Sequence, residues 1–236
     1  MNVKLFKIKY YLERKNSDFE NKMHDVLLVN KQVERQFGKN GDIIVPDEGH
    51  MTHTLSYDEK HGIQAMANKY PDHDPTVENG FVCKYYEYVR LETMSLLAGI
   101  DLLTGEAISF VSESHKSSDF IEFLKILDEK YLEGDTIRLI FDNYSTYIKG
   151  NGLYLATLSE DRFVFVFASI HALWLNMIES FFSKITKQML KGICVHPKDE
   201  LSERIYRYFN EINVDPVVYH WIYKMDEIDS NEVETV

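Results

Sequence analysis

The sequence predicts an α/β protein in which a mixed sheet is flanked by helices and preceded by a short N-terminal helical arm. Short β-rich segments separated by turn residues occupy residues 51–114. Beyond that point, apolar segments of strand length alternate with amphipathic segments of helix length. Hydrophobic residues make up 44% of the 236 residues, which is typical of a folded globular chain.

The N-terminal arm is expected to be a helix over residues 17–37. Ser17 and Glu20 have the spacing of a capping box, and the apolar residues of the segment form a rough stripe. The next segment, 38–50, contains glycine and proline and is expected to be a connection. We therefore divide the chain into an arm and linker at 1–45, a main domain at 46–225 and an acidic tail at 226–236.

Strands are expected at several places in the first half of the main domain. The segment 51–60, "MTHTLSYDEK", is β-rich, and its strand is expected to end at Asp58. Further strand signals and turn residues follow and predict a meander, with strands at 85–90, 93–102 and 107–114 and a turn at 104–106.

The second half alternates helices and strands. Ser117 or Ser118 is expected to cap a helix at 118–131, which Gly134 ends. Continuous apolar strands are expected at 136–143 and 162–168, as in strands buried on both faces. Two helices complete the prediction, one running from "HALWLNMIESFF" (171–182) to about Leu190 and one opened by Pro197 and reaching residue 212.

Composition excludes several classes of protein. No apolar segment approaches the length of a membrane span, and the N-terminus is charged too early for a signal peptide. Cys83 and Cys194 lie far apart, which excludes a zinc knuckle and favours reduced thiols in the cytosol. The net charge of −12 argues against strong, sequence-independent binding to nucleic acid, so we expect weak DNA binding that fades with salt. Residues 226–236 carry five of the acids and no base, and are expected to be solvated and mobile.

Three carboxylates are candidate site residues. Asp142 follows a central apolar strand, where open α/β sheets place their sites. Asp58 also ends a strand signal, and Glu179 lies on an otherwise apolar helix. Taken singly, each has a simpler explanation, because acids are common in turns and on wet helix faces. The polar stripe that carries Glu179 also contains Asn176, Ser180, Ser183 and Lys187.

Taken together, the three acids indicate a metal site. Converging carboxylates repel one another unless a cation neutralises them. Carboxylate oxygens without His or Cys companions suit Mg²⁺ or Mn²⁺. A pair of such ions is suited to phosphoryl transfer, because it activates the attacking oxygen and stabilises the leaving one.

Several motifs resemble one family of enzymes. The segments "SYDEKHGIQAM", "SLLAGIDLLTGE", "IRLIFDN" and "HALWLNMIESFFSKITKQMLKGI" closely resemble bacterial insertion-sequence transposases related to mariner elements, the insertion-sequence six-thirty family. The resemblance implies an RNase H-like catalytic domain with an Asp-Asp-Glu triad formed by Asp58, Asp142 and Glu179. Asp142 and Glu179 are 37 positions apart, which suits the spacing of that family.

The resemblance also implies a reaction and its partners. The expected activity is cleavage at element ends followed by attack of a DNA 3′-hydroxyl on target DNA, with two Mg²⁺ or Mn²⁺ ions as cofactors. The expected partners are element-end DNA and target DNA, without a membrane. Because the family's helix-turn-helix region is missing from this sequence, a separately encoded helix-turn-helix part and a second transposase subunit are further candidate partners. The expected location is the bacterial cytoplasm, in association with the nucleoid.

Residues around the triad are assigned supporting roles. Lys184, Lys187 and Lys191 are expected to contact DNA phosphates, with a solvated helix face as the alternative. A further set of residues is expected to hold the metal ligands in place, namely Asn143, His171 and Asn176. A purely structural histidine remains the alternative at position 171.

Two other functions stay open at this point. The chain can be an inactive transposase remnant that acts as an interaction module, as its acidic charge and missing recognition region suggest. Paired carboxylates also occur in glycosidases, although no other motif in the sequence supports that activity.

Overall fold

The structure is a computed structural model that describes residues 19–46, 49–83, 87–114, 116–141, 162–168, 176–195 and 199–219. Its centre is a five-stranded sheet with the order β3-β2-β1-β4-β5. The pairs β1–β2 and β2–β3 are antiparallel, whereas β1–β4 and β4–β5 are parallel. The predicted mixed sheet is therefore confirmed, and the arrangement is consistent with an RNase H-like fold. The strands are β1 (Thr52–Asn68), β2 (Tyr88–Asp101), β3 (Ala107–Ser112), β4 (Thr136–Phe141) and β5 (Phe163–Phe167).

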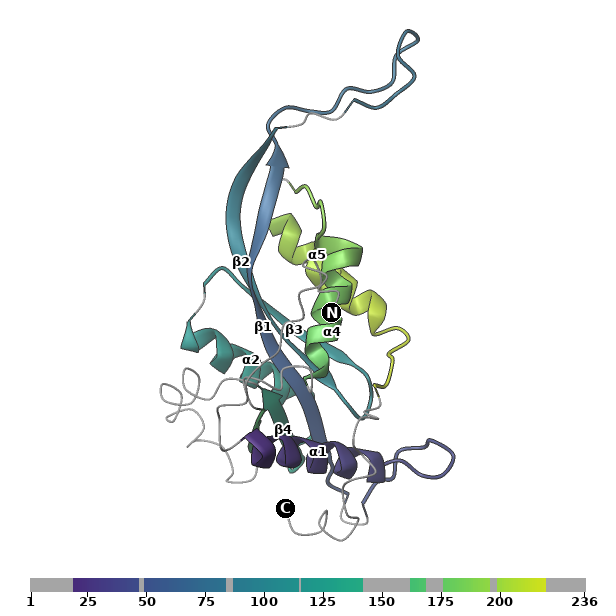
Figure 1. Ribbon diagram of the computed structural model, residues 1–236, viewed down its shortest axis with the longest axis vertical. Coiled ribbons are helices and arrows are strands. Elements are labelled where there is room, and N and C mark those ends of the chain that lie inside the picture. The colour runs from purple at the N-terminus through teal and green to yellow at the C-terminus, as the bar shows by residue number, and fades with distance from the viewer. Residues whose placement is uncertain are drawn as a thin grey trace, which may run out of the picture.

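Helices cover both faces of the sheet (Figure 1). One face packs against α2, while the other packs against α4 and α5. A third cluster joins α1 to the end of the sheet where β2 and β4 finish. Helix α4 continues directly into a π-helical turn, η2. The helices are α1 (Phe19–Arg35), α2 (Ser117–Lys130), α4 (Met177–Ile185), η2 (Thr186–Leu190) and α5 (Asp199–Ile212).

Successive side chains of β1 point alternately to the two faces of the sheet. Leu55 and Tyr57 belong to the aromatic-rich cluster with α2, whose Phe120 and Phe123 are fully buried. Side chains alternate between the faces of a strand, so Ser56, between them, points to the side of α4. Because Leu55 and Tyr57 pack toward α2, the polar residues that alternate with them along β1 face α4.

Helix α1 packs on the sheet through most of its length. Val26, which is fully buried, lies in one cluster with Ile140 of β4 and Ala168. The side chain of Arg138 on β4 donates a hydrogen bond to Gln32, and burial lowers the pKa of this guanidinium. The division between an arm at 1–45 and a main domain stays a prediction, but α1 shares its apolar contacts with the sheet.

Strand β1 does not end at Asp58, contrary to the sequence-based prediction. It continues to Asn68 and pairs with β2, so the strands expected at 85–90 and 93–102 form a single strand from Tyr88 onward. Two register shifts lie between Lys60 and Met66. Gly62 has a φ of 67°, which glycine adopts readily, and allows the strand to continue past this irregularity. The loop that joins the two strands projects well beyond the body of the molecule (Figure 1).

The start of α2 also differs from the prediction. The helix begins at Ser117 after Lys116, and neither Ser117 nor Ser118 caps it. The carboxylate of Asp119 instead accepts hydrogen bonds from the backbone N–H of Lys116, at 3.0 Å, and from the hydroxyl of Ser114, at 2.8 Å. An acid in the first turn satisfies the exposed N–H group and complements the helix dipole.

A buried polar network joins β1, β2 and the start of β4. The ring nitrogens of His53 lie 3.1 Å from Asp101 and 3.2 Å from Asp135, and both carboxylates are almost completely buried. Asp101 also accepts hydrogen bonds from the hydroxyl of Tyr131 and the backbone N–H of Leu103. Burial, and then the negative charge of Asp101, raise the pKa of Tyr131, which therefore remains a protonated donor.

No helix in the described part of the chain combines the length and apolar character that crossing a membrane requires.

Candidate active site

The two strands expected to carry the aspartates are neighbours at the centre of the sheet. Strands β1 and β4 run parallel, with Ser56 opposite Ile140. Two residues beyond Ser56, β1 carries Asp58, which is partly buried. Strand β4 ends at Phe141, and the next residue in the sequence, Asp142, lies outside the described residues. The structure therefore places Asp58 on the strand adjacent to the one that precedes Asp142.

The pairing of β1 with β2 shows which face Asp58 occupies. Asp58 lies opposite Ala98 on β2, and directly paired residues of antiparallel strands project to the same side. Ala98 is fully buried in the cluster that contains Ile178 of α4. Ser56, two residues before Asp58, contacts α4 as well. Asp58 therefore belongs to the face of the sheet that α4 covers.

Three hydrogen bonds attach the start of α4 to β1 immediately before Asp58. The backbone N–H of Ile178 donates to the hydroxyl oxygen of Ser56 at 3.0 Å. That hydroxyl donates to the side-chain oxygen of Asn176. The amide nitrogen of Asn176 in turn donates to the carbonyl oxygen of Tyr57 at 2.9 Å. Since Asn176 is only 2% exposed, these bonds are shielded from water and fix the first turn of α4 on the strand.

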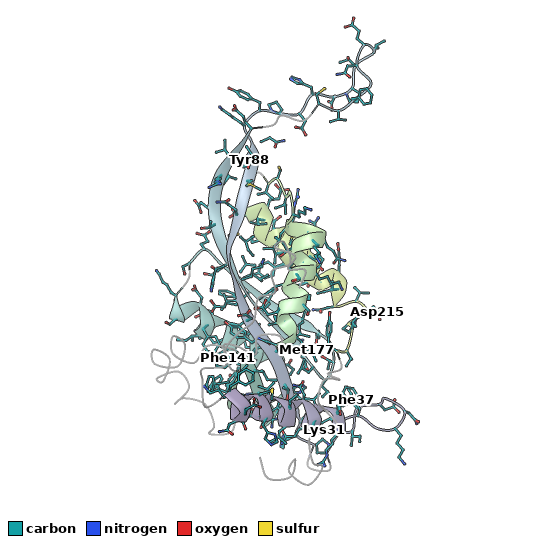
Figure 2. The ribbon with its side chains drawn as sticks, viewed as in Figure 1. Lys31, Phe37, Tyr88, Phe141, Met177 and Asp215 are labelled. Atoms are coloured by element: carbon teal, nitrogen blue, oxygen red, sulfur yellow. The ribbon has the colours of Figure 1, made fainter. Side chains whose placement is uncertain are left out.

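The same turn also reaches β4. Met177, the first residue of α4, packs against the cluster that contains Ile140 of β4 and Ala168 after β5. Figure 2 labels both Met177 and Phe141, the last residue of β4. Helix α4 therefore begins over β1 and β4, close to the point at which β4 ends.

Glu179 is the third residue of this helix and is exposed. Four apolar neighbours on the other side of α4 are buried, so they fix its rotation about the axis. An acid in the first turn also suits the positive end of the helix dipole. The sequence predicts that this helix is anchored by packing of Trp174, Ile178, Phe181 and Phe182. The last three are buried, as is Ile185, whereas Trp174 lies outside the described residues.

The donor types suit a hard divalent ion. Asp58 and Glu179 offer only carboxylate oxygens, and the helix that carries Glu179 begins against the strand that carries Asp58. Within the described residues, no group of three His, Cys, Asp or Glu side chains could hold a metal ion. The predicted set needs Asp142 as its third member, which is not among those residues.

The three lysines are exposed along the far part of the same helix. Lys184 lies on α4, Lys187 on the π-helical turn and Lys191 just after it. The N–H of Lys191 donates to the carbonyl oxygen of Thr186, five residues earlier, which is the spacing of a π-helix. Of the residues expected to hold the metal ligands, Asn176 lies beside Asp58, while Asn143 and His171 fall outside the described residues.

Sequence reasoning missed Ser56. Its hydroxyl bridges Asn176 and Ile178, so it joins the helix to the strand. A signal was present in the sequence, because Ser56 stands between the apolar residues Leu55 and Tyr57, and the structure shows that it is buried. Buried hydroxyls need partners, but the sequence did not indicate that α4 would supply them.

Comparison with known protein families gives a match to the part of the chain that contains the three candidate acids. The family model of DDE superfamily endonucleases matches residues 57–202, more than half of the sequence. The matched segment begins one residue before Asp58 and includes Asp142 and Glu179. A search of curated proteins found no match.

Proposed function

Because the chain belongs to the DDE superfamily endonuclease family, we propose that it is the catalytic domain of a DNA transposase. The proposed reaction is metal-dependent cleavage at element ends. The freed 3′-hydroxyl then attacks a phosphodiester of the target DNA, which joins the two strands and releases a 3′-hydroxyl of the target strand. The motifs shared with insertion-sequence transposases related to mariner elements support this finer assignment. The proposed partners are element-end and target DNA, together with a second transposase subunit or a separately encoded helix-turn-helix part.

One observation carries the proposal most directly. The first turn of α4 is bonded to β1 at Ser56 and Tyr57, the two residues before Asp58. Its first residue, Met177, packs near the end of β4, after which Asp142 follows in the sequence. These water-shielded hydrogen bonds hold the first turn, and with it the backbone of Glu179, in a fixed position next to Asp58.

The proposed roles follow from these positions. Asp58, Asp142 and Glu179 would hold one or two Mg²⁺ or Mn²⁺ ions, which supply Lewis-acid activation of the attacking and leaving oxygens. Asn176 fixes the start of the helix that carries Glu179, and Asn143 and His171 are proposed to orient neighbouring ligands. Binding of phosphates by the exposed lysines would position the DNA strand, with contacts from Lys184, Lys187 and Lys191.

A plasmid-nicking assay tests the triad. With supercoiled DNA and Mg²⁺ or Mn²⁺, we expect Asp58→Asn, Asp142→Asn and Glu179→Gln each to lower nicking at least about a hundredfold. The matched control is Glu129→Gln, which removes the same charge from an exposed position on α2. If Glu179→Gln nicks as fast as the unchanged protein, Glu179 is only part of a wet helix face.

Thermal melting gives a second readout that does not depend on activity. Mn²⁺ should raise the Tm of the unchanged protein, because an ion that binds only the folded state stabilises it. Glu179→Gln and Asp58→Asn should melt as before without metal and should lose most of the Mn²⁺-dependent increase. An unchanged protein that neither nicks DNA nor melts higher with Mn²⁺ would favour the inactive remnant.

A further inference from the structure

Three lysines form an exposed basic face on the helix that carries Glu179. Lys184, Lys187 and Lys191, here called the basic face, form no ion pair within the described residues. Lysines elsewhere on the described surface behave differently, because several are paired with nearby acids. These pairs are Lys31–Glu34, Lys69–Glu87, Lys125–Glu122 and Lys130–Glu106. The basic face therefore offers unneutralised charge in a protein whose net charge is −12.

The end of the described chain is fixed close to this face. After α5, the side chain of Asn213 makes two hydrogen bonds with the backbone of Ala107, at 2.9 and 2.8 Å. The backbone of Val217 then passes so close to Gly105 that a Cβ atom there would lie 2.4 Å from it. Figure 2 marks Asp215 between these two contacts in the sequence, beside the helical layer of α4 and α5.

Tyr219, the last described residue, lies next to the basic face. It lines one pocket together with Lys184 and Phe181. It also packs against the same apolar cluster as Tyr208, whose hydroxyl donates to Gln188 on the π-helical turn at 2.6 Å. Gln188 follows Lys187 directly in the sequence. The described part of the chain therefore ends beside Lys184, the first lysine of the basic face.

The sequence beyond Tyr219 supplies an acidic segment within reach. Residues 226–236 contain five acids and no base. The seven residues from Tyr219 to Asp226 span up to about 23 Å when extended. Lys184 and Lys191 are seven helical residues apart, which corresponds to only about 10 Å. Length therefore allows the acidic segment to reach every lysine of the basic face.

We propose that residues 226–236 bind the basic face of the DNA-free protein and compete with nucleic-acid phosphates for it. The competition rests on the proposed function, in which these lysines contact DNA. A tethered segment acts at an effective concentration of about millimolar, so weak pairing is enough to occupy the face. Glu211 and Asp215 line the same pocket as Lys184 and would repel further acidic groups there. The main contacts are therefore with Lys187 and Lys191.

Neutralising the acidic segment tests the competition. The variant Asp229→Asn, Glu232→Gln, Glu234→Gln should bind a short DNA duplex about three- to tenfold more tightly at low salt, without metal. The matched control removes three charges from the opposite face of the sheet, with Glu122→Gln, Glu129→Gln and Glu133→Gln. This control should change the Kd less than about twofold. If both variants bind the DNA duplex more tightly by the same factor, only the net charge of the protein matters and the proposal is overturned.

A second experiment, in a protein without two lysines of the basic face, tests whether the acidic segment acts through them. In a protein that carries Lys187→Ala and Lys191→Ala, neutralising the acidic segment should no longer tighten DNA binding, because its binding site is gone. If the tightening persists undiminished, the segment acts elsewhere and the proposal fails.

Crosslinking separates this inference from the proposed function. A carbodiimide joins carboxylates to lysines in direct contact, and mass spectrometry locates the pair without any need for DNA or activity. We expect links from 226–236 to Lys187 and Lys191. Links only to Lys125 or Lys130 on α2, or none, would overturn the tail contact. Absence of DNA binding in every variant would instead overturn the proposed function, while the expected links would still uphold the contact.

Discussion

Acidic side chains lie at two places along β1, and the two places differ in how deeply the carboxylates are buried. At its start, Asp101 and Asp135 are almost fully buried around His53, and their oxygens accept several hydrogen bonds. Five residues further along, Asp58 is only partly buried and faces the first turn of α4. The first arrangement encloses its carboxylates among protein donors, whereas the second leaves the carboxylate of Asp58 partly accessible to solvent. The comparison separates an acid that stabilises the fold from one available for chemistry.

Matched substitutions of these acids give the largest expected difference in stability. Asp101→Asn should lower the free energy of unfolding by about 2–4 kcal/mol, because it removes a buried charge that accepts hydrogen bonds from several donors. Asp58→Asn should change it by less than about 0.5 kcal/mol without metal, since the charge of a partly exposed acid contributes little to stability. Urea unfolding at pH 7 measures both variants. A similar loss in the two proteins would remove the distinction.

Asn176 links the stable part of the fold to the candidate site. Asn176→Ala removes the acceptor of the Ser56 hydroxyl and the amide that donates to the carbonyl of Tyr57, so we expect a loss of about 1–3 kcal/mol in stability. It should also lower kcat for nicking about tenfold or more, with a smaller effect on KM, because Glu179 loses its fixed position.

Asn213→Ala is the matched control for this change. Asn213 also uses both ends of its amide, in two bonds to the backbone of Ala107, but at the far edge of the sheet. It should reduce stability by a similar or smaller amount and leave kcat unchanged. If both variants lose activity in proportion to stability, Asn176 has no positioning role.

Local patterns predicted much of the fold and part of the site. The spacing of Ile178, Phe181, Phe182 and Ile185 is that of one helix face, and all four are buried as that pattern requires. The strand β4 was equally visible, because it forms most of the apolar segment 136–143. Such features depend on neighbours in the sequence, so the sequence alone was sufficient.

Long-range contacts account for what was not predicted. The segment after Asp58 contains Lys60 and Gly62 and has the composition of a turn, yet it remains a strand because β2 pairs with it from Tyr88 onward. Ser56 was overlooked because its partners, Asn176 and Ile178, are 120 and 122 residues away. The relation of Asp58 and Glu179 to Asp142 stays a prediction, since Asp142 lies outside the described residues.

Asp119 is an intermediate case, and its expected effect is the smallest. Burial alone would raise the pKa of this carboxyl, but hydrogen bonds from the N–H of Lys116 and from Ser114 together lower it below its ordinary value. A lowered folded-state pKa adds stability that is present above the unfolded value of about 3.9 and is lost as the pH falls through the folded value. Asp119→Asn should therefore cost about 0.5–1 kcal/mol at pH 7, as expected for a charged group in the first turn of a helix.

The pH dependence of the stability lost in Asp119→Asn shows whether the loss comes from the charge of the carboxylate. The stability difference between Asp119→Asn and the unchanged protein should shrink as the pH falls below about 4, because the unchanged carboxyl then becomes neutral like the amide. Urea midpoints at pH 7 and near pH 3 measure this directly. A difference that stays constant across this range would show that the amide fits the turn poorly and that the charge contributes nothing. A difference that disappears would place Asp119 with Asp101, as an acid whose charge is used within the fold and is unavailable for chemistry.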